Sequence, residues 1–203
     1  MAPERVARRL GKLFARCARE ARRFDDASGR ASRALAKLAL VASRWGTLEN
    51  DACYSAALLE ACAGIKSKVL AKQAEVVRLA SLALDEAMDD LDDAVRAMRQ
   101  AAREGAAFVR SEYGADALQR RDGPVVEDRT LSMSAAEYVE GMHEVFTMYS
   151  LCLKLKRAAC AEARTAAPDD ESASRDELIA LFDRPPCYDP ALARDWFARA
   201  TPT

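Results

Sequence analysis

The amino-acid sequence predicts an all-α protein: a long antiparallel coiled-coil hairpin or bundle of helices, followed by short C-terminal helices. Three observations predict this fold class. Half of the 203 residues are hydrophobic, and much of that half is alanine, which forms helices well but buries little area. Charged residues make up 31% of the chain, whereas glycine, proline and aromatic residues are few. Apolar residues recur every three or four positions over long stretches, which is typical of helices with a narrow apolar seam.

Charge divides the chain into a basic beginning and an acidic remainder. Residues 1–50 carry 12 Lys and Arg against 5 Asp and Glu, in a chain whose net charge is −1. A basic amphipathic helix is expected over residues 3–24, with Pro3 at a favourable first position. We expect this helix to dock on an acidic partner, for which the chain's own residues 84–93 are a candidate. An organelle-targeting segment is the second interpretation and a nucleic-acid-binding arm the third.

Two further helices are expected after this one. The segment "DDASG" at 25–29 predicts a break, a second helix follows at about 31–44, and a very long helix is expected at about 51–110. The seam of the long helix has two parts with a phase slip near 80–84. The first part contains Cys62, Ile65, Val69, Lys72, Val76, Leu79 and Ala83, and the second contains Leu84, Ala87, Leu91, Ala94, Met98, Ala101, Gly105 and Phe108.

A fourth helix is expected to pair antiparallel with the long one. A loop at 112–130 separates the two helices, and Ser134 with Glu137 forms a capping box that opens the fourth. The seam of this helix contains Val139, Met142, Phe146, Tyr149, Leu153, Lys156 and Cys160. A helical hairpin cannot bury all of these seams, so we expect some apolar surface to remain for a protein partner.

Short helices complete the predicted fold. A polar linker at 165–174 leads to a second capping box, Ser174 with Glu177, and Asp189-Pro190 has the form of another helix start. The chain therefore divides into a basic helix with its break, a coiled-coil core, and a linker with short helices, which correspond to residues 1–29, 30–164 and 165–203.

The sequence shows no pattern of catalytic or cofactor-binding residues. Glycine-rich phosphate loops are absent, the six cysteines include no C-x-x-C pair, and His143 is the single histidine. No apolar run reaches the roughly 18 residues of a membrane span, and no signal peptide is recognised. We therefore expect no enzyme activity, metal, cofactor or membrane association. The cysteines are expected to serve as small apolar residues in a reducing compartment.

Two separated stretches resemble the family of the cyclin-dependent-kinase-interacting protein, known as CINP. The first is "SRWGTLENDACYSAALL", and the second is "YVEGMHEVFTMYSLCLKLKRAACAEA" at 138–163. The tail "LIALFDRPPCYDP" is similar to the family's aromatic-Pro-Tyr segment. The resemblance covers about residues 35–200, and it departs from the family at "EYGADALQRRDGPVV" and in the basic first helix. A sister family, a small helical ribosome-maturation factor that partners CINP, shares the same general plan.

The residues that carry this resemblance are the candidate sites for partner binding or structural stapling. They are Arg44, Trp45, Thr47, Leu48, Asn50, Asp51, Met148, Tyr149, Leu153, Leu155, Lys156, Arg157, Phe182, Pro185, Pro186 and Tyr188. We predict that Trp45 staples the second helix against the long helix and the 138–163 helix. Thr47 or Asn50 is expected to cap the start of the long helix. Plain core packing of Trp45 is the interpretation we favour over direct contact with a partner.

The resemblance implies a non-catalytic coiled-coil adaptor that works as a subunit of a nuclear, and also cytoplasmic, hetero-oligomer. It implies protein partners held through helical seams: a second small helical subunit, AAA ATPases, and also a cyclin-dependent kinase. The implied processes are ribosome biogenesis, DNA replication and cell-cycle control. The alternative is a basic nucleic-acid- or ribosome-binding helical factor that uses residues 1–24. Phosphate binding weakens steeply with salt, whereas pairing through apolar seams does not, so salt dependence separates the two.

Overall fold

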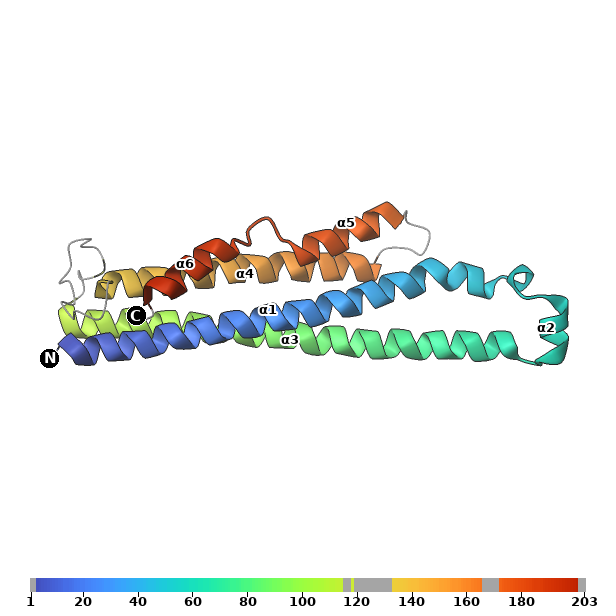
Figure 1. The fold of residues 1–203 in the computed structure, drawn as a ribbon, viewed down its shortest axis with the longest axis horizontal. Helices are drawn as coiled ribbons and strands as arrows, with labels where there is room; N and C mark the ends of the chain where they lie inside the picture. The colour runs from blue at the N-terminus through green and yellow to red at the C-terminus, as the bar shows by residue number, and fades with distance from the viewer. Residues whose placement is uncertain (1–2, 115–117, 119–132, 166–171, 201–203) are drawn as a thin grey trace. The chain divides into compact units, whose positions relative to one another are not determined.

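The structure is a computed structural model that describes residues 3–114, 118, 133–165 and 172–200 (Figure 1). These residues form helices joined by turns and contain no strand, so the predicted all-α class is confirmed. In chain order the elements are α1 (Pro3–Glu49), the 3-10 turn η1 (Asp51–Cys53), α2 (Ala56–Ala61), α3 (Ile65–Tyr113), α4 (Ala135–Thr165), α5 (Ser172–Asp183) and α6 (Pro190–Ala200).

The chain divides into two compact units, and the three long helices contribute to both. Unit 1 contains Met1–Asp26, Asp90–Lys154 and Pro186–Thr203, and unit 2 contains Ala27–Asp89 and Leu155–Pro185. Each unit thus combines parts of α1, α3 and α4 with one short C-terminal helix, which is α6 in unit 1 and α5 in unit 2.

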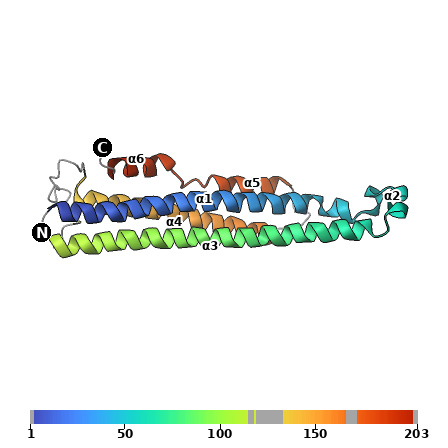
Figure 2. The ribbon, with the colours of Figure 1, turned by 60° about the horizontal axis from the view of Figure 1, so that its bottom comes forward.

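Unit 1 is a bundle in which α1 and α3 run antiparallel, because Arg9 of α1 lies over the ring of Phe108 while Arg23 reaches Asp90. Aromatic side chains close its core. The ring of Phe14 lies edge-on to those of Tyr138 and Phe197, at centroid distances of 5.7 and 5.8 Å. These contacts fasten α4 and α6 to α1, and Figure 2 shows α6 beside α1.

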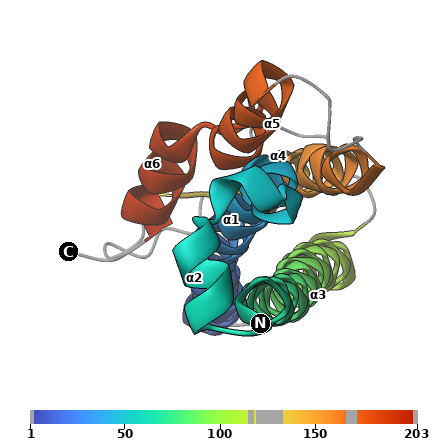
Figure 3. The ribbon, with the colours of Figure 1, turned by 90° about the vertical axis from the view of Figure 1, so that its right-hand side faces the viewer.

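Unit 2 has a smaller core, in which α1, α3, α4 and α5 meet. Its buried residues are Ala31, Ala34, Leu35, Leu84, Ala87, Ala159, Cys160, Leu178 and Phe182. Figure 3, viewed along the helices, shows α5 beside α1 and α4. The buried Lys156 ammonium donates a hydrogen bond to the carbonyl of Phe182, in the last turn of α5. A cation at this end satisfies a carbonyl that lacks an intrahelical partner and complements the helix dipole.

The predicted break at 25–29 is wrong, because α1 continues without interruption from Pro3 to Glu49. Phe24, Ala27 and Ala31 are all buried, so the three-four spacing of core positions runs through the segment. Gly29 and its polar neighbours are poor helix formers, but tertiary packing overrides a local cost of about 1 kcal/mol. The expected helices at 3–24 and 31–44 are therefore one.

The real interruption lies between residues 50 and 64, where the sequence analysis placed the start of the long helix. Ser55 caps α2 by accepting a hydrogen bond from the Leu58 amide at 3.2 Å. Gly64 then adopts a φ of 77°, a left-handed conformation that favours glycine, and α3 begins at Ile65. The chain therefore turns over about 15 residues, using η1 and α2.

The register of α3 is a second correction. Its predicted second seam, from Leu84 to Phe108, is buried throughout and is confirmed. The prediction that the first seam faces other helices is wrong, because Cys62, Lys72 and Ala83 are exposed. The exposed fraction of Leu79 is 52%. The positions that continue the three-four spacing of Leu84 backwards are instead Ala80, which is buried, and Val77, which is half-buried. The predicted phase slip near 80–84 does not occur.

The other predicted boundaries have mixed outcomes. The first capping box is confirmed: the Ser134 hydroxyl accepts from the Glu137 amide at 3.2 Å, and the Glu137 carboxylate accepts from the Ser134 amide at 2.7 Å. The second is wrong as a helix start, because α5 begins at Ser172. Most of the predicted loop at 112–130 lies outside the described residues, as does the linker from 166 to 171.

Candidate protein-docking groove

The candidate site is an apolar groove in unit 2. It lies where α4 and α5 end and only α1 and α3 extend further. The core cluster of unit 2 ends with Leu35 and Leu38 on α1 and with Leu84 on α3. Figure 1 shows α1 and α3 extending past the ends of α4 and α5 toward α2. Two helices alone cannot enclose an apolar core, so the groove stays open to solvent along the α1–α3 pair.

The groove has a volume of about 540 Å³ and walls from four helices. Apart from Ser81 and Trp45, every lining side chain is aliphatic. The lining residues are Leu35, Leu38, Ala39, Val41, Ala42 and Trp45 of α1, Ala74, Val77, Ser81 and Leu84 of α3, Ala163 of α4, and Leu178 and Ile179 of α5. A concave, mostly aliphatic surface of this kind offers apolar contact area to a ligand, and no histidine, cysteine or charged side chain lines it.

Trp45 lies in the wall of this groove and is half-buried. Its indole N–H donates a hydrogen bond to the Glu49 carboxylate at 2.7 Å, one turn further along α1. The polar end of the indole is thus satisfied on the helix surface, and the rings remain available as an apolar contact. Stapling by Trp45, core packing and direct contact with a partner all stay predictions.

The three neighbours of Trp45 in the resembling stretch do not line the groove. Thr47 and Asn50 are exposed, and Leu48 is half-buried with its carbonyl bonded to the Tyr54 hydroxyl at 3.0 Å. Asn50 caps the short turn η1, because its side chain accepts from the Ala52 amide at 3.0 Å. The prediction that Thr47 or Asn50 caps the long helix is wrong, since α3 begins only after this turn.

Four of the predicted site residues belong to the core of unit 1. Met148, Tyr149 and Leu153 are buried on α4. The Tyr149 and Tyr188 hydroxyls donate hydrogen bonds to the two carboxylate oxygens of Asp25, at 3.3 and 3.0 Å. Burial raises the pKa of both phenols above its ordinary value. These residues fasten the segment after α5 to α1 and α4.

The remaining predicted residues lie in unit 2, except Pro186, which lies in unit 1. Lys156, Phe182 and Pro185 are buried, and the Lys156 ammonium lies 4.3 Å from the centre of the Phe182 ring. Arg157 is exposed on α4. Of the whole predicted set, only Trp45 lines the groove, so most of the residues that carry the resemblance pack the fold.

The sequence analysis did not predict which large apolar residues are exposed. Of the six large hydrophobic residues that are exposed in the described part of the chain, five belong to unit 2 and the sixth, Leu151, belongs to unit 1. The five are Leu40, Leu58, Leu59, Leu79 and Leu82. They lie on α1, α2 and α3, on the same stretch of chain that forms the groove. Apolar side chains on several faces of one region favour a role in protein contact.

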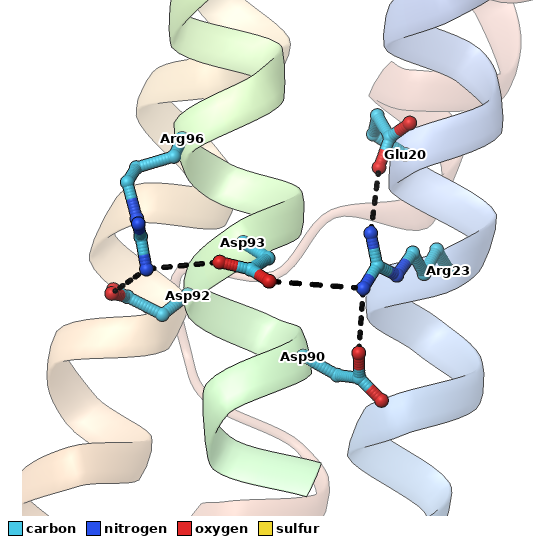
Figure 4. Close-up of polar contacts among 6 residues, drawn as sticks. All are labelled: Glu20, Arg23, Asp90, Asp92, Asp93 and Arg96. Atoms are coloured by element: carbon cyan, nitrogen blue, oxygen red, sulfur yellow. Dashed lines mark hydrogen bonds and ion pairs between the residues drawn. The ribbon is translucent and has the colours of Figure 1, made fainter. Parts of the chain in front are cut away.

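One basic residue of the predicted first helix, Arg23, binds the acidic stretch of α3, which agrees in part with the preferred interpretation. Figure 4 shows Arg23 between Asp90 and Asp93, with its guanidinium 2.6 Å from Asp90 and 3.9 Å from Asp93. Asp93 also bonds Arg96 at 2.9 Å, which links the pair into a small surface network. The hydrogen bond that the Arg23 guanidinium donates to the Asp90 carboxylate raises the pKa of Arg23, so the guanidinium stays charged. Such exposed pairs contribute modestly to stability and fix orientation.

The described residues hold no group of three or more His, Cys, Asp or Glu side chains placed to bind a metal ion. Among the described helices, none is long and apolar enough to cross a membrane. The exposed His143 lies 6.1 Å from the ring of Phe146, and no cysteine contacts it in the described part of the chain.

Comparison with known proteins decides the family. Residues 4–188 match the CA109-like family, described as ribosome biogenesis protein C1orf109-like. The chain belongs to the CA109-like family. No curated protein and no solved structure matches it. The CA109-like family is a sister of CINP, so the match supports the ribosome-maturation sister and does not support CINP itself. The matched region includes the whole groove and all sixteen candidate site residues from Arg44 to Tyr188, whereas α6 lies beyond it.

Proposed function

We propose that this CA109-like chain is a non-catalytic, protein-binding subunit that acts in ribosome biogenesis in the nucleus. The family match supports the process, and the aliphatic groove along α1 and α3 supports the mode of action. The groove carries the proposal, because it is a concave apolar surface whose one hydroxyl, that of Ser81, has no general base among the lining residues to activate it.

The groove suits an amphipathic helix of a partner. Its floor runs between two antiparallel helices, so a third helix can lie along it and present side chains at three-four spacing. Trp45 supplies the large aromatic contact that commonly dominates such interfaces, and small residues such as Ala39 and Ala74 allow close approach. Covering the groove removes aliphatic area from water at roughly 25 cal/mol per Å².

We assign the docked helix to a second small helical subunit of the CINP kind. The resemblance to both sister families supports this choice, since it implies that the two small factors pair. The same resemblance implies that the pair works with AAA ATPases, and it extends the role to DNA replication and to a cyclin-dependent kinase. In this proposal the chain contributes binding surface, and the ATPases contribute the chemical work.

The test is affinity purification of the tagged full-length chain from cells, followed by mass spectrometry after a wash at raised salt. The groove variant carries Ala39→Glu and Ala74→Glu, which place two charges on the groove walls. The matched control carries Ala36→Glu and Ala83→Glu, on exposed positions of the same two helices outside the groove. We expect the wild type and the control to retain a small helical subunit and AAA ATPases, and the groove variant to lose them.

Equal far-UV circular dichroism of the two double variants would show that the added charges leave the helices intact. Retention of the same partners by the groove variant would refute docking in the groove. Recovery of no ribosome-biogenesis protein with the wild type would refute the proposed process.

A further inference from the structure

A second surface of the chain, on α1 in unit 1, carries basic residues that the fold does not use. Its five members are Arg5, Arg8, Lys12, Arg19 and Arg22, and we call them the basic stripe. All five are exposed, and no hydrogen bond or ion pair joins them to any side chain that the structure describes. Their spacing of three, four, seven and three places them on one helix face, over a length of about 26 Å.

The stripe lies opposite the buried face of α1. Leu10, Phe14 and Cys17 are buried in the core, about half a helical turn away from the stripe. Two other basic residues of α1, Arg16 and Arg23, are seven positions apart and form ion pairs with α3. Arg16 lies 3.7 Å from Glu104, and Arg23 binds Asp90. Contacts with α3 therefore explain the charges of these two residues. The five positive charges of the stripe point away from unit 1.

The chemistry of the stripe excludes two kinds of partner. The centre of a protein interface is enriched in apolar area, and no large hydrophobic side chain is exposed on α1 before Leu40 in the part of the helix whose side chains the structure describes. Insertion into a lipid surface needs an exposed apolar helix face, and that face of α1 is buried by Phe14 and its neighbours. What remains is a polyanion bound by charge and hydrogen bonding alone.

We infer that the basic stripe binds the phosphate backbone of double-stranded RNA. Four of its five members are arginines, whose planar guanidinium groups bind phosphate oxygens in pairs. The stripe has no aromatic residue on which a base can stack, so it contacts the backbone without reading sequence. The surface itself specifies a polyphosphate, and the choice of RNA over DNA rests on the proposed function in ribosome biogenesis.

The test is fluorescence anisotropy of the purified full-length chain with a labelled RNA duplex of about 16 base pairs. Because the net charge of the chain is −1, attraction to a polyanion has to come from a local surface. Five phosphate contacts predict that log K falls with log salt at a slope of about −4 to −5. The affinity is then expected to fall about 500-fold between roughly 50 and 200 mM salt.

The decisive variant changes all five stripe residues to glutamine. Its matched control changes five exposed basic residues of unit 2 to glutamine, namely Arg33, Lys37, Arg44, Lys68 and Lys72. We expect the stripe variant to lose at least 100-fold in affinity and most of its salt slope, and a single Arg19→Gln change to lower the slope by about 1. The control and the groove variant with Ala39→Glu and Ala74→Glu are expected to bind RNA like the wild type.

Three results would overturn the inference. The first is equal RNA binding by the stripe variant and the wild type, and the second is an equal loss in the control. The third is tighter binding of the stripe to a DNA duplex, or to vesicles of phosphatidylserine, than to the RNA duplex. The purified components contain no protein partner, so failure here leaves the groove result standing, and failure of the groove test leaves this one standing.

Discussion

Gly141 and Gly105 allow a matched test of how closely the helices of unit 1 pack. Both glycines are buried inside long helices, Gly141 on α4 and Gly105 on α3. A Cβ atom at Gly141 would lie 2.5, 2.8 and 3.0 Å from three ring atoms of Trp196 on α6. A Cβ atom at Gly105 would lie 2.6 Å from the terminal methyl of Met142 and 3.7 Å from Val139.

The two obstacles differ in what can move. The Met142 methyl ends a flexible side chain and can turn aside, whereas the Trp196 indole is rigid. It is also held, because its N–H donates a hydrogen bond to Glu144 at 2.7 Å and only 8% of Trp196 is exposed. Gly141→Ala therefore has to displace α6 or shift α4, and overpacking of this kind costs about 1–3 kcal/mol.

The gain in helix propensity from glycine to alanine, about 1 kcal/mol, is common to both variants and cancels between them. The predicted difference is thus about 1–3 kcal/mol in the free energy of unfolding, with Gly141→Ala less stable than Gly105→Ala. Urea unfolding followed by far-UV circular dichroism measures it. In a Trp45→Phe background Trp196 is the only tryptophan, so its emission is expected to shift to the red if α6 is displaced. A Gly141→Ala variant as stable as Gly105→Ala, with unshifted emission, would refute the reasoning.

Three further predictions follow from the geometry of single groups. Ser134→Ala is expected to cost about 1 kcal/mol in urea unfolding, because the Glu137 amide loses its cap, and an unchanged midpoint would count against the cap. Burial raises the pKa of Tyr188 from 10.0 to about 12, so above pH 10 the unfolded chain releases this phenol proton first. The stability of the wild type is therefore expected to fall between pH 10 and 12. The urea midpoint of Tyr188→Phe is expected to fall less steeply with pH than that of the wild type. Equal pH dependence of the two midpoints would contradict the raised pKa. Burial also raises the pKa of the Cys17 thiol to about 12, so iodoacetamide is expected to alkylate the exposed Cys53 long before Cys17, and mass spectrometry that finds equal rates would disprove it.

Sequence reasoning located the parts of this fold that are set by local pattern and strong side-chain chemistry. The seam from Leu84 to Phe108 is apolar at every core position except Gly105. Its three-four period can therefore be recognised from the sequence of α3 alone. The box at Ser134 and Glu137 needs only two side chains three residues apart. Both features can be recognised from residue types and their spacing within one helix, and for that reason the sequence alone was sufficient.

The errors arose where tertiary packing outweighed local preference. Residues 25–29 read as a break because aspartate, serine and glycine are weak helix formers, yet Ala27 is buried and the helix continues. On α3 the large residues Val69 and Leu79 suggested the seam, whereas the smaller Ala74 and Ser81 face the groove. Size is a poor guide where alanine permits close helix contact, and only the register of the neighbouring helix resolves it.

The same scarcity of large side chains explains why the groove exists. In unit 1, Phe14, Tyr138 and Phe197 fill the space among four helices, and the core closes. In unit 2 the last large buried side chain is Phe182, and beyond it the α1–α3 pair offers mainly alanine and valine. Alanine contacts bring two helices together but bury little area, so they leave an aliphatic trough with Trp45 as its largest side chain. A partner helix that brings its own large apolar residues would complete the core that this chain leaves open.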